Sequence, residues 1–103
     1  MIAFNHNQTE KEITLTFTGR MDTLAATEVN TLIENEPVVQ NRQPDESIVF
    51  DLKDVDYIAS SFIRICVSQA RLAGQGRFSI ANCQPMVRKT FKISGLDEVL
   101  NIT

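Results

Sequence analysis

The sequence predicts an α/β fold in which a mixed sheet of four or five strands is covered by helices. Three observations lead to this prediction: alternating side chains near the N-terminus, a nearly continuous apolar run at residues 47–52, and helical spacing between glycine and proline boundaries later in the chain. The 103 residues, 43% of them hydrophobic and 22% charged, are the size of one compact domain. We therefore expect residues 1–103 to form a single domain.

Two short stretches near the N-terminus alternate in the way that is typical of strands. The first stretch holds Ile2, Phe4 and His6, and the second holds Ile13, Leu15 and Phe17. Threonines occupy the intervening positions of the second stretch, and the polar residues 7–10 between the two stretches suit a turn. The pattern predicts an opening hairpin with one covered face.

A helix is expected after the hairpin, because apolar residues then recur at helical spacing. These residues are Ala25, Val29, Leu32 and Ile33. Either Asp22 or Thr23 is available as the N-cap, and the helix is expected to run to about Asn35. The following residues, 36–46, contain two prolines and little periodicity, so they predict a connecting loop.

Residues 47–52 are rich in β-branched and aromatic side chains, as expected of a central strand that is covered on both faces. Residues 60–73 predict a largely buried helix with one narrow polar stripe. The stripe consists of Ser60, Arg64, Ser68 and Arg71. Glycines at positions 74 and 76 end this helix, and Ser60 begins its exposed stripe.

The C-terminal part of the chain predicts one more strand and one more helix. Residues 77–81 alternate as a strand, and a helix opens at Pro85 and closes near Gly95. The last residues, 96–102, are expected to pack their apolar side chains against the body. The order of strands and helices calls for parallel pairing with right-handed crossovers.

Two strand-to-helix turns, residues 19–22 and 56–61, are expected to meet at one edge of the sheet, where open α/β sheets place their sites. Asp22 and Ser60 are therefore candidates for a shared surface. A serine at a helix start can cap backbone N–H groups, and the positive end of the helix dipole also favours a phosphate added to it. The position of Ser60 thus suits both an N-cap and a phosphorylation site.

Composition and charge argue against several classes of function. The net charge of −3 and pI of about 5.0 disfavour direct nucleic-acid binding, and no apolar run approaches the roughly 20 residues of a membrane span. Cys66 and Cys83 lack metal-ligand spacing and are interpreted as reduced core residues, so we expect no metal and no cofactor. Without a paired nucleophile and base or a phosphate-binding glycine loop, we expect a cytoplasmic protein that is not an enzyme.

Three segments together resemble the STAS domains, the family of the bacterial anti-sigma factor antagonists. Residues 15–22 are similar to the family's apolar strand that ends in Gly-x-x-Asp, and residues 49–58 to its central strand and approach loop. Residues 59–65, Ala-Ser-Ser-Phe-Ile-Arg-Ile, fall where the family has Asp-Ser-Ser-Gly-Leu-Gly-Val. The resemblance covers essentially the whole chain, and the order and spacing of the segments are more specific than each one alone.

The resemblance implies a regulatory protein-binding module controlled by phosphorylation. Ser60 matches the family's phosphoacceptor, Ser61 its hydroxyl neighbour, and Asp22 the acidic residue after the glycine turn. The implied partner is an anti-sigma factor or the serine kinase of a partner-switch system. The expected binding surface comprises Asp22, Ser61, Phe62, Ile63 and Arg64, with Phe62 and Ile63 supplying apolar contact.

The chain also departs from the family pattern at residues that bear on the switch. Ala59 replaces the acidic residue before the serine, and Phe62 and Arg64 replace two glycines. Phe62 either narrows the approach of a kinase or enlarges the apolar contact surface, and Arg64 is placed to pair with a phosphate one turn away. The alternative function is a constitutive STAS scaffold or accessory subunit of a signalling or transport assembly, in which Ser60 is never modified.

Overall fold

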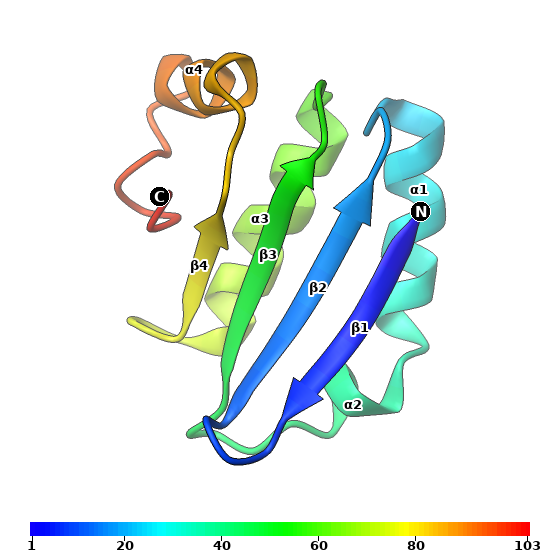
Figure 1. Ribbon diagram of the computed structural model, residues 1–103, viewed down its shortest axis with the longest axis vertical. Coiled ribbons are helices and arrows are strands. Elements are labelled where there is room, and N and C mark those ends of the chain that lie inside the picture. The colour runs from blue at the N-terminus through cyan, green and yellow to red at the C-terminus, as the bar shows by residue number, and fades with distance from the viewer.

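The computed structural model describes residues 1–103 and contains one mixed sheet of four strands in the order β1-β2-β3-β4 (Figure 1). Strands β1 (Ile2–Asn7) and β2 (Glu12–Thr18) form the predicted antiparallel hairpin. Strand β3 (Ser47–Asp54) lies parallel to β2 on one side and to β4 (Phe78–Ala81) on the other. The predicted α/β class and the parallel crossovers are therefore confirmed.

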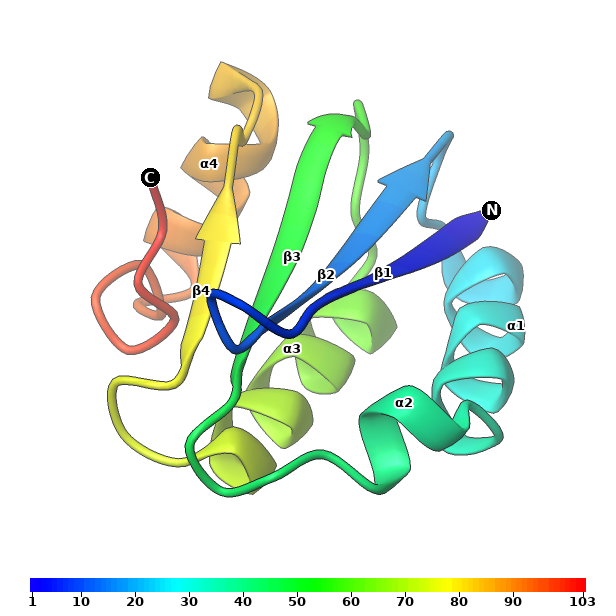
Figure 2. The same cartoon turned by 60° about the horizontal axis from the view of Figure 1, so that its bottom comes forward.

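Helices α1 (Thr23–Glu34), α2 (Pro37–Gln40) and α3 (Ser60–Ala73) lie on the same side of the sheet (Figure 2). Helix α4 (Pro85–Ile93) follows β4 at the carboxyl end of that strand (Figure 1). None of these helices has both the length and the apolar character that crossing a membrane requires.

Residues 36–46 contain a short helix where the sequence predicted only a loop. Pro37 occupies the first position of α2, where its missing N–H has no intrahelical partner to lose. The Glu36 side chain caps the helix by accepting a hydrogen bond from the Val38 N–H at 3.2 Å. Val39 of α2 is buried in the core and anchors this connection to it.

Strand β3 corrects the expectation that its two faces are both covered. Ile48, Phe50 and Leu52 are fully buried, whereas Val49 and Asp51 are partly exposed. The reason is that α1, α2 and α3 cover only one side of the sheet (Figure 2). The strand therefore has the alternating burial of a one-sided sheet.

The core lies between the covered face of the sheet and the helices, and aromatic rings form its centre. The Phe17 and Phe50 ring centroids are 4.8 Å apart, and Phe62 of α3 contacts Phe17 edge-on at 5.2 Å. Such tilted arrangements are the preferred geometry of aromatic pairs. The C-terminal residues close the far edge of the sheet, because Ile102 forms a parallel bridge with Ile80 of β4.

Candidate partner-binding site

The two strand-to-helix turns meet at one edge of the sheet, as predicted. The Gly19 N–H donates to the Asp54 carbonyl at 3.0 Å, and the Met21 N–H donates to the Tyr57 carbonyl at 2.9 Å. The Ala59 N–H in turn donates to the Met21 carbonyl at 2.8 Å. These main-chain hydrogen bonds join the two turns into one continuous edge. We call residues 19–22 and 57–64 together the loop rim.

Side chains on both sides of these main-chain hydrogen bonds also join the two turns. The Arg20 guanidinium lies 3.9 Å from the centre of the Tyr57 ring, which is a cation–π contact on the solvent side. Met21 and Ile58 are buried beneath and anchor the turns to the core. Gly19 has a φ of +95°, which a residue with a Cβ rarely adopts, so this turn requires glycine.

Asp22, one of the two N-cap candidates in the sequence, is the N-cap of α1. Its carboxylate accepts a hydrogen bond from the Ala25 N–H at 2.9 Å, and its backbone is extended. Asp22 also follows Met21 in the chain, and Ser60 follows Ala59, so the Met21–Ala59 bond brings both candidate residues to the loop rim. A role for Asp22 in partner binding stays a prediction.

Ser60 is the first residue of α3 and is exposed, but it is not the N-cap. Ala59 holds the cap position, and no side chain caps the helix. The Ala59 carbonyl accepts the N–H groups of Phe62 and Ile63 at 3.0 and 3.2 Å. The expectation that the Ser60 hydroxyl caps the helix is therefore wrong, because Ser60 lies one residue inside the position from which a side chain caps.

Ser61 has the opposite environment to its neighbour. Its hydroxyl oxygen is buried and has no hydrogen-bond partner. Ser61 lines a hollow of about 310 Å³ between α1 and α3, together with Thr27, Asn30 and Arg64. Of the two serines, Ser60 is the one in the solvent-exposed position.

Phe62 corrects the prediction that this side chain supplies apolar contact at the surface. It is fully buried, and its ring packs against Phe17 and Phe50 with centroids at 5.2 and 6.3 Å. Successive helical residues are rotated by about 100°, so residue 62 turns toward the sheet while Ser60 and Arg64 face solvent. Ile63 is partly exposed and Arg64 is exposed, so both remain available for contact.

The two cysteine side chains are free thiols held in the neutral form. Burial raises the pKa of the Cys66 thiol well above its ordinary value. Burial also raises the pKa of Cys83 to about 11. Neither thiol is therefore activated as a nucleophile at neutral pH.

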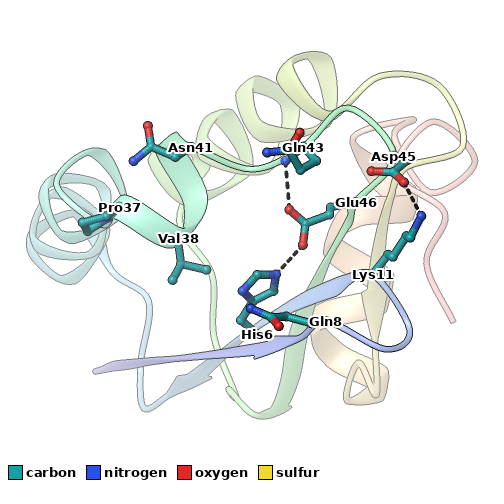
Figure 3. Close-up of a pocket in the computed structure, with 9 residues that line it drawn as sticks. All are labelled: His6, Gln8, Lys11, Pro37, Val38, Asn41, Gln43, Asp45 and Glu46. Atoms are coloured by element: carbon teal, nitrogen blue, oxygen red, sulfur yellow. Dashed lines mark hydrogen bonds and ion pairs between the residues drawn. The ribbon is translucent and has the colours of Figure 1, made fainter.

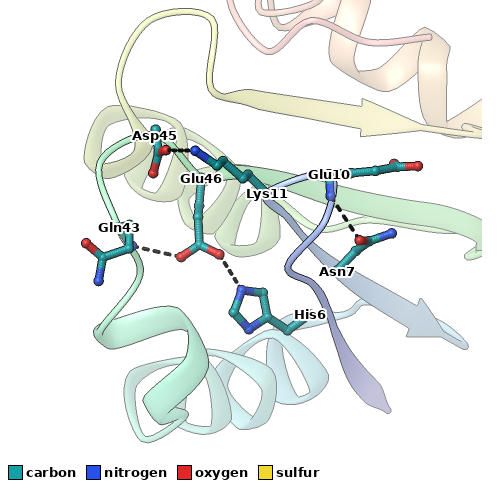
Figure 4. A network of polar contacts seen from close by, with 7 residues as sticks. All are labelled: His6, Asn7, Glu10, Lys11, Gln43, Asp45 and Glu46. Carbon is teal, nitrogen blue, oxygen red and sulfur yellow. Dashed lines mark hydrogen bonds and ion pairs between the residues drawn. The ribbon is translucent and has the colours of Figure 1, made fainter.

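Sequence reasoning missed a polar cleft (Figure 3). It lies where β1 ends and β3 begins, at the opposite end of the sheet from the loop rim (Figure 1). It has a volume of about 630 Å³ and lies between the β1–β2 hairpin, α2 and the segment that enters β3. His6 of β1 is hydrogen-bonded to Glu46, and the Gln43 N–H donates to the same carboxylate at 2.8 Å (Figure 4). His6 and Glu46 are 40 positions apart in the sequence, so no local pattern predicts their contact. The only indication is the alternation of β1, which turns His6 toward the helices.

The Glu46 carboxylate is buried and its hydrogen bonds are satisfied by the protein. The Gln43 N–H and the His6 side chain lower the pKa of Glu46 below its ordinary value. Lys11 and Asp45 form an exposed ion pair beside it at 2.6 Å (Figure 4). The cluster joins the hairpin to the segment before β3.

Residues 3–103 match the family model of the STAS domain. A comparison with curated protein sequences gives no significant match. The family match extends over nearly the whole chain and includes both turns of the loop rim.

Solved structures show the same fold at low sequence identity. An anti-sigma-factor antagonist (STAS) domain protein from Planctomyces limnophilus has a TM-score of 0.82 and 18% identity over 99% of this chain and 87% of that one. The anti-sigma factor antagonist SpoIIAA in its unphosphorylated form has a TM-score of 0.77 and 20% identity over 100% and 88%. The Bacillus cell fate determinant SpoIIAA in its phosphorylated form has a TM-score of 0.69 and 19% identity over 100% and 91%.

Proposed function

The chain belongs to the STAS domain family, and from that premise we propose that it is a regulatory protein-binding module of the anti-sigma factor antagonist type. In this proposal the loop rim docks an anti-sigma factor or the serine kinase of a partner-switch system in the cytoplasm. Asp22, Ile63 and Arg64 are the contact residues. Similar structures of SpoIIAA, one unphosphorylated and one phosphorylated, support this assignment at the level of the fold.

The observation that carries the proposal is the position of Ser60. Its side chain is exposed at the first turn of α3, and no side chain caps that turn. The backbone N–H groups and the positive end of the helix dipole therefore face the added phosphate without a competing carboxylate. Arg64 lies one helical turn further on, where it supplies a second positive charge.

The proposed switch works by adding charge to a docking surface. The kinase transfers the γ-phosphoryl group of ATP to the Ser60 oxygen, the new O–P bond replaces the bond to ADP, and the hydroxyl proton leaves. The phosphate adds about −1.5 to −2 charge at pH 7. Desolvation and repulsion in a complex that formed around the neutral hydroxyl then release the partner.

The test is to incubate the protein with cell lysate and ATP and to measure its intact mass and the proteins that co-purify with it. We expect one added phosphate that Ser60→Ala abolishes while binding is retained. Ser60→Asp should weaken partner capture by at least about tenfold, because a charge enters the interface. Asp also suits the first turn of a helix, so thermal stability should not fall. An unmodified Ser60 with an active cognate kinase, together with full binding by Ser60→Asp, would reject the switch.

Ala59 supports the second candidate, a constitutive scaffold or accessory subunit whose Ser60 is never phosphorylated. The family has an acidic residue at this position, and Ala59 contributes neither its charge nor a capping oxygen. A scaffold would bind its partner equally well as wild type, Ser60→Ala and Ser60→Asp. The three proteins together therefore distinguish the two candidates.

A further inference from the structure

A groove runs along α3 on the flank that faces the C-terminal residues 96–101. It consists of two adjoining hollows, of about 560 and 660 Å³, which share Val67, Arg71 and Leu96. We call this feature the α3 groove. It extends beside residues 63–74, which is about 16 Å along the helix axis at 1.5 Å per residue.

The α3 groove is lined by both polar and apolar residues and leaves large apolar side chains in solvent. Leu72, which is 66% exposed, lines one of the two hollows, and Val99, which is 69% exposed, lines the other. Ile63, Val67 and Leu96 between them are only partly buried. Large apolar side chains that are exposed around a hollow are typical of a docking site.

Two arginines give the groove a defined charge pattern. Arg64 and Arg71 are seven residues apart on α3, so they lie on the same side of the helix about 10.5 Å apart along its axis. Neither forms an ion pair, since the ion pairs of this chain join Lys11 to Asp45 and His6 to Glu46. Glu98 lines the end of the groove that lies away from the loop rim.

We propose that the α3 groove binds an amphipathic helix of the partner protein. That helix carries an apolar face, two carboxylates seven residues apart that meet Arg64 and Arg71, and a basic residue near Glu98. About three turns of helix fill the length of the groove. The proposal rests on the proposed function, because it assumes a partner protein, and it adds which element of that partner is held.

A second copy of this chain does not match the groove in charge. Helix α1 has exposed leucines, but its carboxylates Glu28 and Glu34 are six residues apart and therefore about 120° apart around the helix. It can meet only one of the two arginines at a time. Helix α4 carries Arg88, Lys89 and Lys92, which would repel them.

The probe is a capped synthetic peptide of about 14 residues, with leucines on one helical face, two glutamates seven residues apart and a lysine near its C-terminus. Its control has lysines in place of both glutamates. We expect saturable amide shifts of the ¹⁵N-labelled protein that cluster at Val67, Leu72 and Val99. Binding of the control should be at least about tenfold weaker.

Two variants of the groove separate this proposal from the Ser60 switch. Arg71→Glu, about three turns from Ser60, should weaken binding of the acidic peptide about fivefold, and Leu72→Ser should weaken it about tenfold. Met86→Ser is the matched control, because Met86 is 70% exposed on α4 outside the groove, and it should leave affinity unchanged. Thermal stability measured on all three variants shows that each is folded.

Absence of saturable shifts, equal binding of the lysine peptide, or shifts confined to another face would overturn the proposal. Self-association of the protein alone in sedimentation equilibrium, lost in Leu72→Ser, would assign the groove to a second copy and overturn it as well. The peptide experiment uses neither kinase nor ATP. If the peptide does not bind but Ser60 is phosphorylated and Ser60→Asp loses its partner, only the groove proposal is rejected. If the peptide binds but Ser60 shows neither effect, only the switch is rejected.

Discussion

Adjacent residues at the start of α3 have different roles because the helix turns each of them to a different side. Ser60 faces solvent, the Ser61 oxygen is buried between two helices, and Phe62 enters the core. A kinase can therefore reach the hydroxyl of Ser60 directly, whereas the buried oxygen of Ser61 is not accessible from solvent. Phe62 stands where the family has a glycine, and here it supplies packing between the helix and the sheet.

Replacing Phe62 by alanine should destabilise the protein by about 3–5 kcal/mol, because the substitution leaves a cavity beside Phe17 and Phe50. The chain has no tryptophan, so urea unfolding is best followed by far-UV circular dichroism. Leu72→Ala on the same helix is the control, and it should cost less than about 1 kcal/mol because Leu72 is 66% exposed. Similar losses in both variants would contradict the buried position of Phe62.

At the scale of elements, the sequence predicted the helices and strands that depend on neighbouring residues. It did not predict features that depend on contacts between distant parts of the chain. The hairpin, α1, α3 and α4 follow from alternation, helical spacing and proline or glycine boundaries within each segment. Helix α2 was missed because four residues are too few to show a period. Whether one or both faces of β3 are covered depends on where the helices pack, although the polar Ser47 and Asp51 already marked its open face.

The same distinction applies to the candidate site. Parallel topology was sufficient to bring the two turns of the loop rim together. Helix α3 has its N-cap at Ala59, one residue before the predicted cap Ser60. Sequence patterns do not place the end of a helix to within one residue. Phe62 lies three and four residues before the buried Ile65 and Cys66, and this helical spacing, not the family pattern, indicates that its side chain is buried.

The uncapped start of α3 predicts that Ala59→Asp stabilises the protein by about 1 kcal/mol. Ala59 already has the extended backbone of an N-cap, with φ −91° and ψ 165°, so the new carboxylate can accept the N–H of Ser61. Ala59→Asn provides the matched cap without the charge. A rise in the urea midpoint for both variants measures capping, and the difference between them measures the charge at the helix terminus. Unchanged midpoints would mean that this helix start has no unsatisfied N–H groups.

On the scale of the whole molecule, polar residues gather at both ends of the sheet. The loop rim at the carboxyl ends of β2 and β3 presents Ser60 and Arg64. The opposite end holds the His6–Glu46 pair and the Lys11–Asp45 pair, which tie the N-terminal hairpin to the chain entering β3 (Figures 3 and 4). Stability and binding should therefore respond to different residues.

The Glu46 cluster predicts a specific dependence of stability on pH. Hydrogen bonds from the Gln43 N–H and His6 favour the ionised carboxylate, so the pKa of Glu46 is lower in the folded protein than the ordinary value of 4.5. A group with a lowered folded pKa contributes stability above its unfolded pKa, and that contribution is lost as the pH falls through the folded pKa. Stabilisation by Glu46 should thus be complete above about pH 5 and decline below about pH 4.5.

Glu46→Gln keeps an acceptor for the Gln43 N–H but removes the titrating group. We expect the variant to unfold at lower urea than wild type at pH 7, and the difference to narrow steadily below pH 4.5 because the wild-type carboxylate then gains a proton. Glu28→Gln, which removes an exposed carboxylate of α1, is the control and should follow the wild-type curve. If the wild-type and Glu46→Gln curves stayed parallel from pH 7 to pH 3, the buried carboxylate would not be a source of acid sensitivity. Partner capture at pH 7 should be unaffected by Glu46→Gln, since the cluster and the loop rim lie at opposite ends of the sheet (Figure 1).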